Sequence, residues 1–174
     1  MTKYFKVLFD DVGIHGVAYV LDKKKDLFCL PYFGPVADWQ PRALELREGE
    51  CADYLANDLG CRLCSERLKN ILDSEASPSD VLQWLPAEVR CAGITHKYWI
   101  LHFPSPPDVL DKNRTKFADR FVVMPVLSKE AVADHRVFIY PEAGEHRMFV
   151  AEPVKRIIDA SGCTGMEFSR APTA

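Results

Sequence analysis

The stretch VAEPVKRIIDASGCTGMEF, residues 150 to 168, carries the clearest signals of secondary structure in the chain. Pro153 suits the first turn of a helix, because its missing N–H has no partner to lose there. Gly162 can take the left-handed conformation that ends a helix, and residues 166–168 then alternate as in a strand. The apolar residues recur at the spacing of one helix face: Val150, Val154, Ile157 and Ile158. The stretch predicts a helix and a strand with one apolar face that packs on a sheet.

A similar string occurs earlier in the chain. SERLKNILDS at residues 65–74 aligns without gaps with AEPVKRIIDA at 151–160. Two amphipathic helices with acidic starts can converge on such strings, and an internal duplication of a helix-plus-strand unit would also produce them. Either origin predicts two similar amphipathic helices, 65–74 and 152–161, and Ser65 is the expected N-cap of the first.

The rest of the chain is richer in strand signals than in helix signals. A short helix is predicted at 53–59 and a short helix or turn at 130–134, and the charged run Asp22–Asp26 is expected to join two strands of a hairpin. The fold class is therefore predicted to be α+β, with a mainly antiparallel or mixed sheet. No linker interrupts the chain, which predicts one domain over residues 1–170 and a frayed tail at 171–174. The expected strands are 4–9, 16–21, 27–30, 43–46, 81–89, 98–103, 121–126, 137–140 and 148–150.

Composition narrows the classes of partner. The 174 residues include 22 basic and 25 acidic side chains, for a net charge of −3, which argues against a general nucleic-acid binder. The first apolar run, Val7–Phe9, is too short for a signal peptide, and no run is long enough to cross a bilayer. Six cysteines without an export signal are typical of free thiols in a reducing compartment. We expect a cytoplasmic protein without nucleic-acid or membrane partners.

Cys61 and Cys64 form a C-x-x-C pair just before the helix predicted at 65–74. A thiol at a helix N-terminus has a lowered pKa, so the pair could belong to a thiol-disulfide oxidoreductase. That reading needs a strand before the motif, whereas 53–60 reads as helix and turn, and two small core residues would fit as well. The remaining cysteines and the histidines are scattered without the spacing of a zinc site, and no metal or cofactor is predicted. No nucleophile, base and orienting partner converge, which argues against an enzyme.

Residues 32–41 combine aromatic side chains with two prolines and a glycine, which predicts an irregular loop. Aromatic residues in such a loop either cap the core or anchor a partner protein. The candidate binding residues are Tyr32, Phe33 and Trp39, together with Lys24 from the nearby charged turn.

Six short motifs follow one another in a fixed order: Ser65–Lys69, Leu82–Pro86, Tyr98–His102, Asp108–Asp111, Arg136–Phe138 and Gly165–Phe168. This order resembles that of an immunity-protein family of bacterial polymorphic toxin systems, long catalogued only as a domain of unknown function. The likeness extends over roughly residues 40 to 169. Each motif alone is unspecific, and their shared order carries the resemblance.

This resemblance implies a non-catalytic protein that binds and neutralises a cognate toxin protein by occluding it. It also implies structural roles for the matched residues, with Trp84, Tyr98, Trp99 and Phe168 in the core and Pro86 and Gly165 shaping the backbone. Cys61 and Cys64 do not belong to the family pattern. A thiol-disulfide oxidoreductase and a generic protein-binding scaffold are the alternatives, and the sequence leaves the oligomeric state open.

Overall fold

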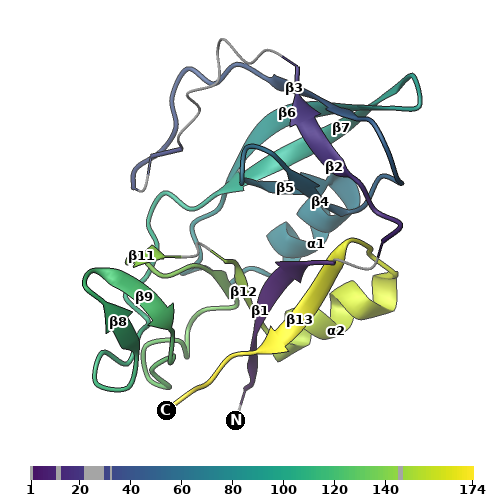
Figure 1. The fold of residues 1–174 in the computed structure, drawn as a ribbon. Helices are drawn as coiled ribbons and strands as arrows, with labels where there is room; N and C mark the ends of the chain where they lie inside the picture. The colour runs from purple at the N-terminus through teal and green to yellow at the C-terminus, as the bar shows by residue number, and fades with distance from the viewer. Residues whose placement is uncertain (1, 11–12, 22–29, 32, 145–146) are drawn as a thin grey trace.

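A computed structural model describes residues 2–10, 13–21, 30–31, 33–144 and 147–174 (Figure 1). It has a six-stranded barrel, a four-stranded sheet, a small three-stranded sheet and two helices. The predicted α+β class, with mixed sheets and two similar helices, is confirmed. The second predicted strand of the 16–30 hairpin and its charged turn lie mostly outside the described residues.

The barrel closes through the strand order β2-β3-β6-β7-β5-β4 and contains both parallel and antiparallel pairs. Its longest pair is the β6–β7 hairpin, which runs in unbroken antiparallel register and turns at Ala92–Gly93, where both φ angles are positive. Residues alternate between inside and outside along β6, so that Leu85, Ala87 and Val89 fill the interior. The strands are β2 (Val17–Val20), β3 (Arg42–Leu46), β4 (Tyr54–Asn57), β5 (Arg62–Ser65), β6 (Gln83–Cys91) and β7 (Ile94–His102).

The four-stranded sheet joins the two ends of the chain. Its order is β10-β12-β1-β13, and all of its pairs are antiparallel. The N-terminal strand β1 lies between the strands that precede and follow the second helix. The strands are β1 (Tyr4–Phe9), β10 (Val137–Phe138), β12 (Phe149–Ala151) and β13 (Met166–Arg170).

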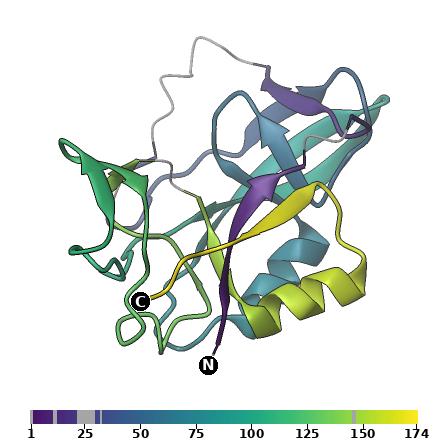
Figure 2. The ribbon, with the colours of Figure 1, turned by 60° about the horizontal axis from the view of Figure 1, so that its bottom comes forward.

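A third, smaller sheet lies beside the other two (Figure 2). It consists of the hairpin formed by β8 (Lys116–Ala118) and β9 (Phe121–Met124), with β11 (Ala143–Gly144) parallel to β9.

Both helices follow a strand without a loop, and they contact each other. Helix α1 (Glu66–Glu75) packs on β5 and β7 of the barrel, whereas α2 (Glu152–Ser161) packs on β1 and β12 of the four-stranded sheet. Gly162 ends α2 in the left-handed conformation, as predicted. One detail of the predicted apolar stripe is wrong: Ile157 is exposed, and the buried residues of α2 are Val154 and Ile158.

Two apolar clusters hold this arrangement together. One fills the barrel, and the other lies between the four-stranded sheet, the helices and residues 101–140. Of the predicted core residues, Tyr98 is buried, while Trp84, Trp99 and Phe168 are only partly buried.

Two local predictions differ from the structure. The helix predicted at 53–59 is instead strand β4 followed by a turn, because pairing with β2 and β5 closes the barrel and overrides the local pattern. Residues 171–174, which were expected to fray, instead lie against residues 127–129. The Leu127 N–H donates to the Pro172 carbonyl oxygen, and the Ala174 N–H donates to the Leu127 carbonyl oxygen.

Candidate functional site

The segment from Phe33 to Trp39 is tied to the barrel rather than free in solution. The Gly34 N–H donates to the carbonyl of Pro104 at 2.7 Å, and Nε2 of His102 lies 2.8 Å from the Gly34 carbonyl oxygen. The Gln83 side chain both donates to and accepts from the backbone of Val36, at 2.8 Å each. The structure therefore presents Phe33, which is 58% exposed, on a fixed backbone.

Trp39 has a different position from Phe33. Its indole Nε1 donates to the carbonyl oxygen of Pro86 at 2.8 Å, and the Arg42 guanidinium lies 5.4 Å from the ring centre. The ring is partly buried and packs against the barrel cluster. Of the two roles that the sequence left open for aromatics in this loop, packing on the core fits Trp39, whereas Phe33 is too exposed for that role. The other two candidates, Tyr32 and Lys24, lie outside the described residues.

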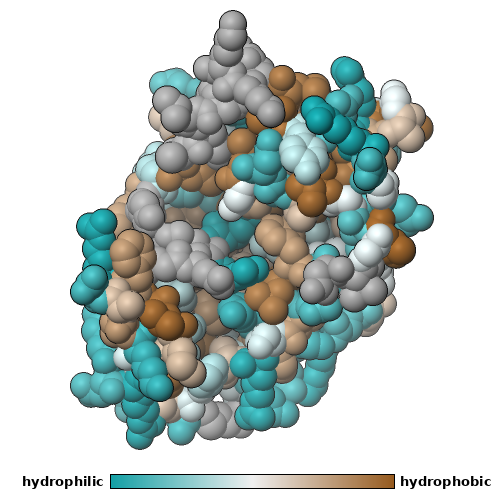
Figure 3. Space-filling view, viewed as in Figure 1, coloured by the Kyte–Doolittle hydropathy of each residue, from teal (hydrophilic) through white to brown (hydrophobic). Residues whose placement is uncertain are grey.

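The β8–β9 hairpin carries a second apolar surface that sequence reasoning missed. Figure 3 shows apolar residues over this hairpin, bordered by hydrophilic ones. Only Val122 of β9 is buried, so the apolar run FVVM, which reads as a buried strand, mostly faces solvent. The alternation of its burial could not be deduced from residues that are all apolar. The exposed side chains are Phe117 at 39%, Phe121 at 49%, Val123 at 60% and Met124 at 55%.

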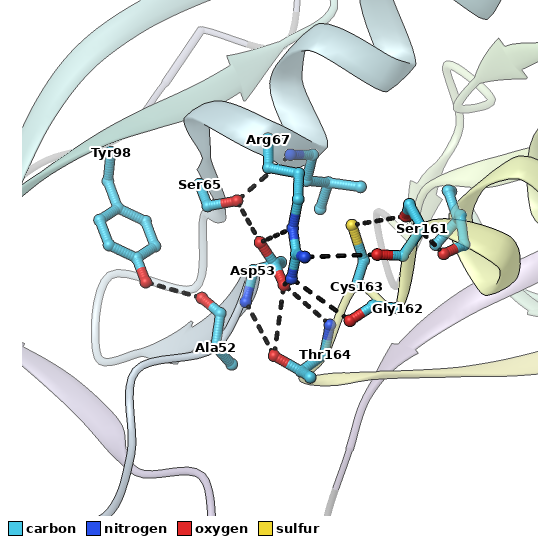
Figure 4. Close-up of polar contacts among 11 residues, drawn as sticks. Ala52, Asp53, Ser65, Arg67, Tyr98, Ser161, Gly162, Cys163 and Thr164 are labelled. Carbon is cyan, nitrogen blue, oxygen red and sulfur yellow. Dashed lines mark hydrogen bonds and ion pairs between the residues drawn. The ribbon is translucent and has the colours of Figure 1, made fainter.

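Asp53 is the centre of the densest polar network near the helices (Figure 4). Its side chain is 9% exposed and accepts hydrogen bonds from Ser65 Oγ at 2.5 Å, Arg67 Nε at 3.1 Å and the Thr164 N–H at 2.9 Å. Burial opposes ionisation, but the hydrogen bonds from Arg67, Ser65 and Thr164 outweigh it and hold the pKa of Asp53 below its ordinary value.

Arg67 extends this network to the second helix. Its Nη1 and Nη2 donate to the carbonyl oxygens of Ser161 and Gly162, both at 3.3 Å, at the end of α2. The cation thus joins a barrel carboxylate to the helix C-terminus, where positive charge is favourable. The hydrogen bonds of this network link the barrel, α1 and the end of α2, and they hold both helices against the barrel.

A profile of the Imm11 immunity protein family matches residues 35–173. The chain belongs to this family. The matched range includes Trp39, both helices and the β8–β9 hairpin, and Phe33 lies just before it. No curated protein matches the chain.

The cysteine pair of this Imm11 protein is poorly suited to redox chemistry. Burial raises the pKa of the Cys61 thiol to about 12, and it raises the pKa of Cys64 as well. Both side chains are reduced and donate their S–H groups, Cys61 to Asn57 Oδ1 at 3.2 Å and Cys64 to the Arg62 carbonyl at 3.7 Å. Cys64 lies within β5, one residue before the N-cap Ser65, and it is fully buried in the cluster beside the helices.

Among the residues that the structure describes in this Imm11 protein, no three His, Cys, Asp or Glu side chains come together as a group that could hold a metal ion. No helix in the same residues combines the length and apolar character needed to cross a membrane.

Proposed function

We propose that this Imm11 protein binds a cognate bacterial toxin in the cytoplasm and neutralises the toxin by occluding it. In this proposal the Imm11 protein catalyses no reaction itself. The observation that carries the proposal is the family match over residues 35–173, which spans most of the chain. The buried, high-pKa thiols of Cys61 and Cys64 support the non-catalytic part of the proposal.

The side of the molecule that carries the most exposed apolar residues is the best candidate for the interface. In Figures 1 and 2, the dark blue segment at residues 33–38 and the β8–β9 hairpin lie on the same side of the barrel. Phe33 and Phe121 are exposed there, and exposed aromatic side chains on a fixed backbone are typical anchors of protein interfaces. A specific complex needs to bury about 1,000 Å² or more in total, so we expect the interface to include residues from both surfaces.

Within this surface we assign Phe33 to direct contact and Trp39 to supporting the loop from behind. Tyr32 and Lys24 remain candidates on sequence grounds. The loop is held at Gly34 and Val36, so binding would require little ordering of its backbone.

The decisive experiment is co-expression with the toxin domain encoded by the neighbouring gene. We expect cells producing this protein to survive the toxin, and the two proteins to co-purify in a defined ratio. Continued killing without complex formation would refute the pairing.

A matched pair of variants tests the surface. Phe33→Asp should weaken binding by about tenfold or more, since it places a charge in an apolar contact. Ile94→Asp is the control, because Ile94 is 62% exposed at the far β6–β7 turn and should leave binding within about twofold of wild type. Equal effects of the two variants would remove the loop from the interface.

A further inference from the structure

Most cations of the described chain are neutralised by a neighbour, and the exceptions are clustered. On the helices, Lys69 pairs with Asp73 at 2.6 Å and Lys155 pairs with Asp159 at 2.5 Å. The described lysines and arginines that form no ion pair are Lys6, Arg90, Lys116, Arg120, Lys129 and Arg170. All of these except Arg90 belong to the β8–β9 hairpin or line the grooves beside it.

A shallow groove runs between β9 and the four-stranded sheet. One wall is formed by Val123, Met124 and Pro125, and the opposite side includes Lys6 and Phe149. The groove continues at Arg170–Pro172 into a second depression, which Lys3 and Lys129 also line. No aspartate or glutamate side chain is among the residues that line either depression.

The composition of this groove is unusual for a chain with a net charge of −3. Its apolar wall is exposed, with Val123 and Met124 both more than half accessible, and its charged residues are of one sign. Lys3 is the one lining cation with a carboxylate neighbour, Glu152 at 3.5 Å. Unneutralised cations beside an apolar surface attract carboxylates and gain most when the adjoining apolar area is buried at the same time.

We infer that this groove docks an acidic segment of the toxin, in which carboxylates flank one or two apolar side chains. The inference rests on the proposed function and specifies the part of the partner that is recognised. The apolar side chains of the segment contact Val123 and Met124, while its carboxylates pair with Arg170 and Lys129. Arg120 is already ordered over the Phe121 ring, 5.5 Å from its centre, and adds positive charge at the hairpin end of the same surface.

Arg170 and Arg90 provide a matched test. Both are exposed arginines on strands, and neither forms an ion pair, but only Arg170 lines the groove. With the purified toxin domain as the probe, Arg170→Glu should weaken binding by about tenfold, mostly through slower association, and Arg170→Glu/Lys129→Glu by more. Arg90→Glu should stay within about twofold of wild type. Met124→Ala should also weaken binding, with Ile94→Ala as its control.

The outcomes separate the groove from the function as a whole. If wild-type protein neither protects cells nor binds the toxin domain, the proposed function fails. If wild type binds and the Arg170 variants bind equally well, the groove is not the docking site. Tighter binding of Arg170→Glu would mean that the segment is basic, and equal losses with Arg90→Glu would mean that only the overall charge matters; each result overturns the inference. Unfolding curves that superimpose with wild type confirm that the variants fold.

An exchange of charges between the toxin segment and the groove tests the inference directly. Replacing the carboxylates of the docked toxin segment with lysine should restore the affinity that Arg170→Glu/Lys129→Glu removes. The salt dependence of binding should also be weaker for the double variant than for wild type, because fewer charge pairs form.

Discussion

The two strand–helix units, β5–α1 and β12–α2, are alike along their lengths and different at their ends. Leu68 and Leu72 are fully buried in α1, and the aligned Val154 and Ile158 are buried in α2. Lys69 and Lys155 also correspond: each pairs with the aspartate four residues later and lies over two aromatic rings. These rings belong to Trp84 and Trp99 on the barrel, and to Phe5 and Phe168 on the four-stranded sheet.

The helix ends differ because their neighbours differ. At the start of α1, Ser65 Oγ accepts from the Leu68 N–H, as an N-cap does. At the start of α2 no side chain caps the helix; the Glu152 N–H donates to the Lys3 carbonyl at 2.8 Å, and Pro153 has no N–H to satisfy. Two helices with the same amphipathic pattern thus pack on two different sheets. The backbone N–H groups at the start of each helix are satisfied by different neighbours.

The largest effect should come from truncating the shared apolar face. Leu72→Ala and Ile158→Ala each remove a fully buried side chain, and each should lower the free energy of unfolding by about 3 to 4 kcal/mol. Urea unfolding measures both. Similar losses would support equivalent roles, and a loss below about 1 kcal/mol in one of them would break the comparison between the helices.

Asp53→Ala should be nearly as damaging, because it belongs to neither helix and yet joins both. The variant leaves Arg67, Ser65 and the Thr164 N–H without their acceptor, and a loss of about 3 kcal/mol is expected. Asp159→Ala is the control, since its pair with Lys155 is exposed and should contribute about 0.5 kcal/mol or less. Equal losses would mean that Asp53 is no more than another surface ion pair.

The same carboxylate predicts a dependence on pH. The pKa of Asp53 is lower in the folded protein than in the unfolded chain, so its contribution is present above about pH 4 and is lost as the pH falls through the folded pKa. The difference in unfolding free energy between wild type and Asp53→Asn should therefore shrink on acidification. A difference that is constant from neutral pH to pH 2 would contradict this.

The glycines after α2 should differ in their tolerance of alanine. A Cβ on Gly165 would lie 2.4 Å from both the Tyr54 carbonyl oxygen and the Ala52 Cβ, whereas a Cβ on Gly162 would meet nothing within 4 Å. Both residues have positive φ, so Gly162→Ala should cost about 1 kcal/mol and Gly165→Ala about 2 to 3 kcal/mol. Thermal unfolding measures the stability of both variants. Equal shifts in their melting temperatures would rule out the proposed crowding at Tyr54.

The smallest effects test the helix starts. Ser65→Ala removes an N-cap and should cost about 1 to 2 kcal/mol. The reverse change, Ala151→Ser, should raise stability by less than about 0.5 kcal/mol, because Ala151 is buried and the added hydroxyl would lose its hydration, while the Glu152 N–H already donates to Lys3 and Pro153 has no N–H. A clear gain from Ala151→Ser would show that α2 begins with an unsatisfied donor.

Much of the fold could be predicted because the deciding patterns are local. Pro153 and Gly162 set the limits of α2, Ser65 sets the start of α1, and the dense β-forming residues at 98–103 correctly predict part of β7. The strand at Tyr54–Asn57 could not be predicted, because its residues also suit a short helix and only pairing with β2 and β5 makes them a strand. The cysteine pair shows the same limit, since burial raises the pKa of both thiols, Cys61 inside the barrel and Cys64 in the cluster beside the helices, and no spacing rule reports burial.

The candidate surface was predicted only in part. The sequence pointed to an aromatic loop, and the structure separates an exposed Phe33 from a partly buried, hydrogen-bonded Trp39. The apolar wall at Val123 and Met124 and the unpaired Arg170 were not predicted, because they are distant in sequence and meet only where β9 lies beside the four-stranded sheet.

The sequence by itself determined the helices, most strands, the α+β class and the family, because these depend on residue order and on periodicities of a few residues. The tertiary structure alone decided how the stretch at 150–168 is used. Its helix docks on a sheet whose central strand comes from the N-terminus, and its end is joined to Asp53 through Arg67. Those contacts cross about a hundred residues of chain, and their partners are chosen by packing and charge in three dimensions.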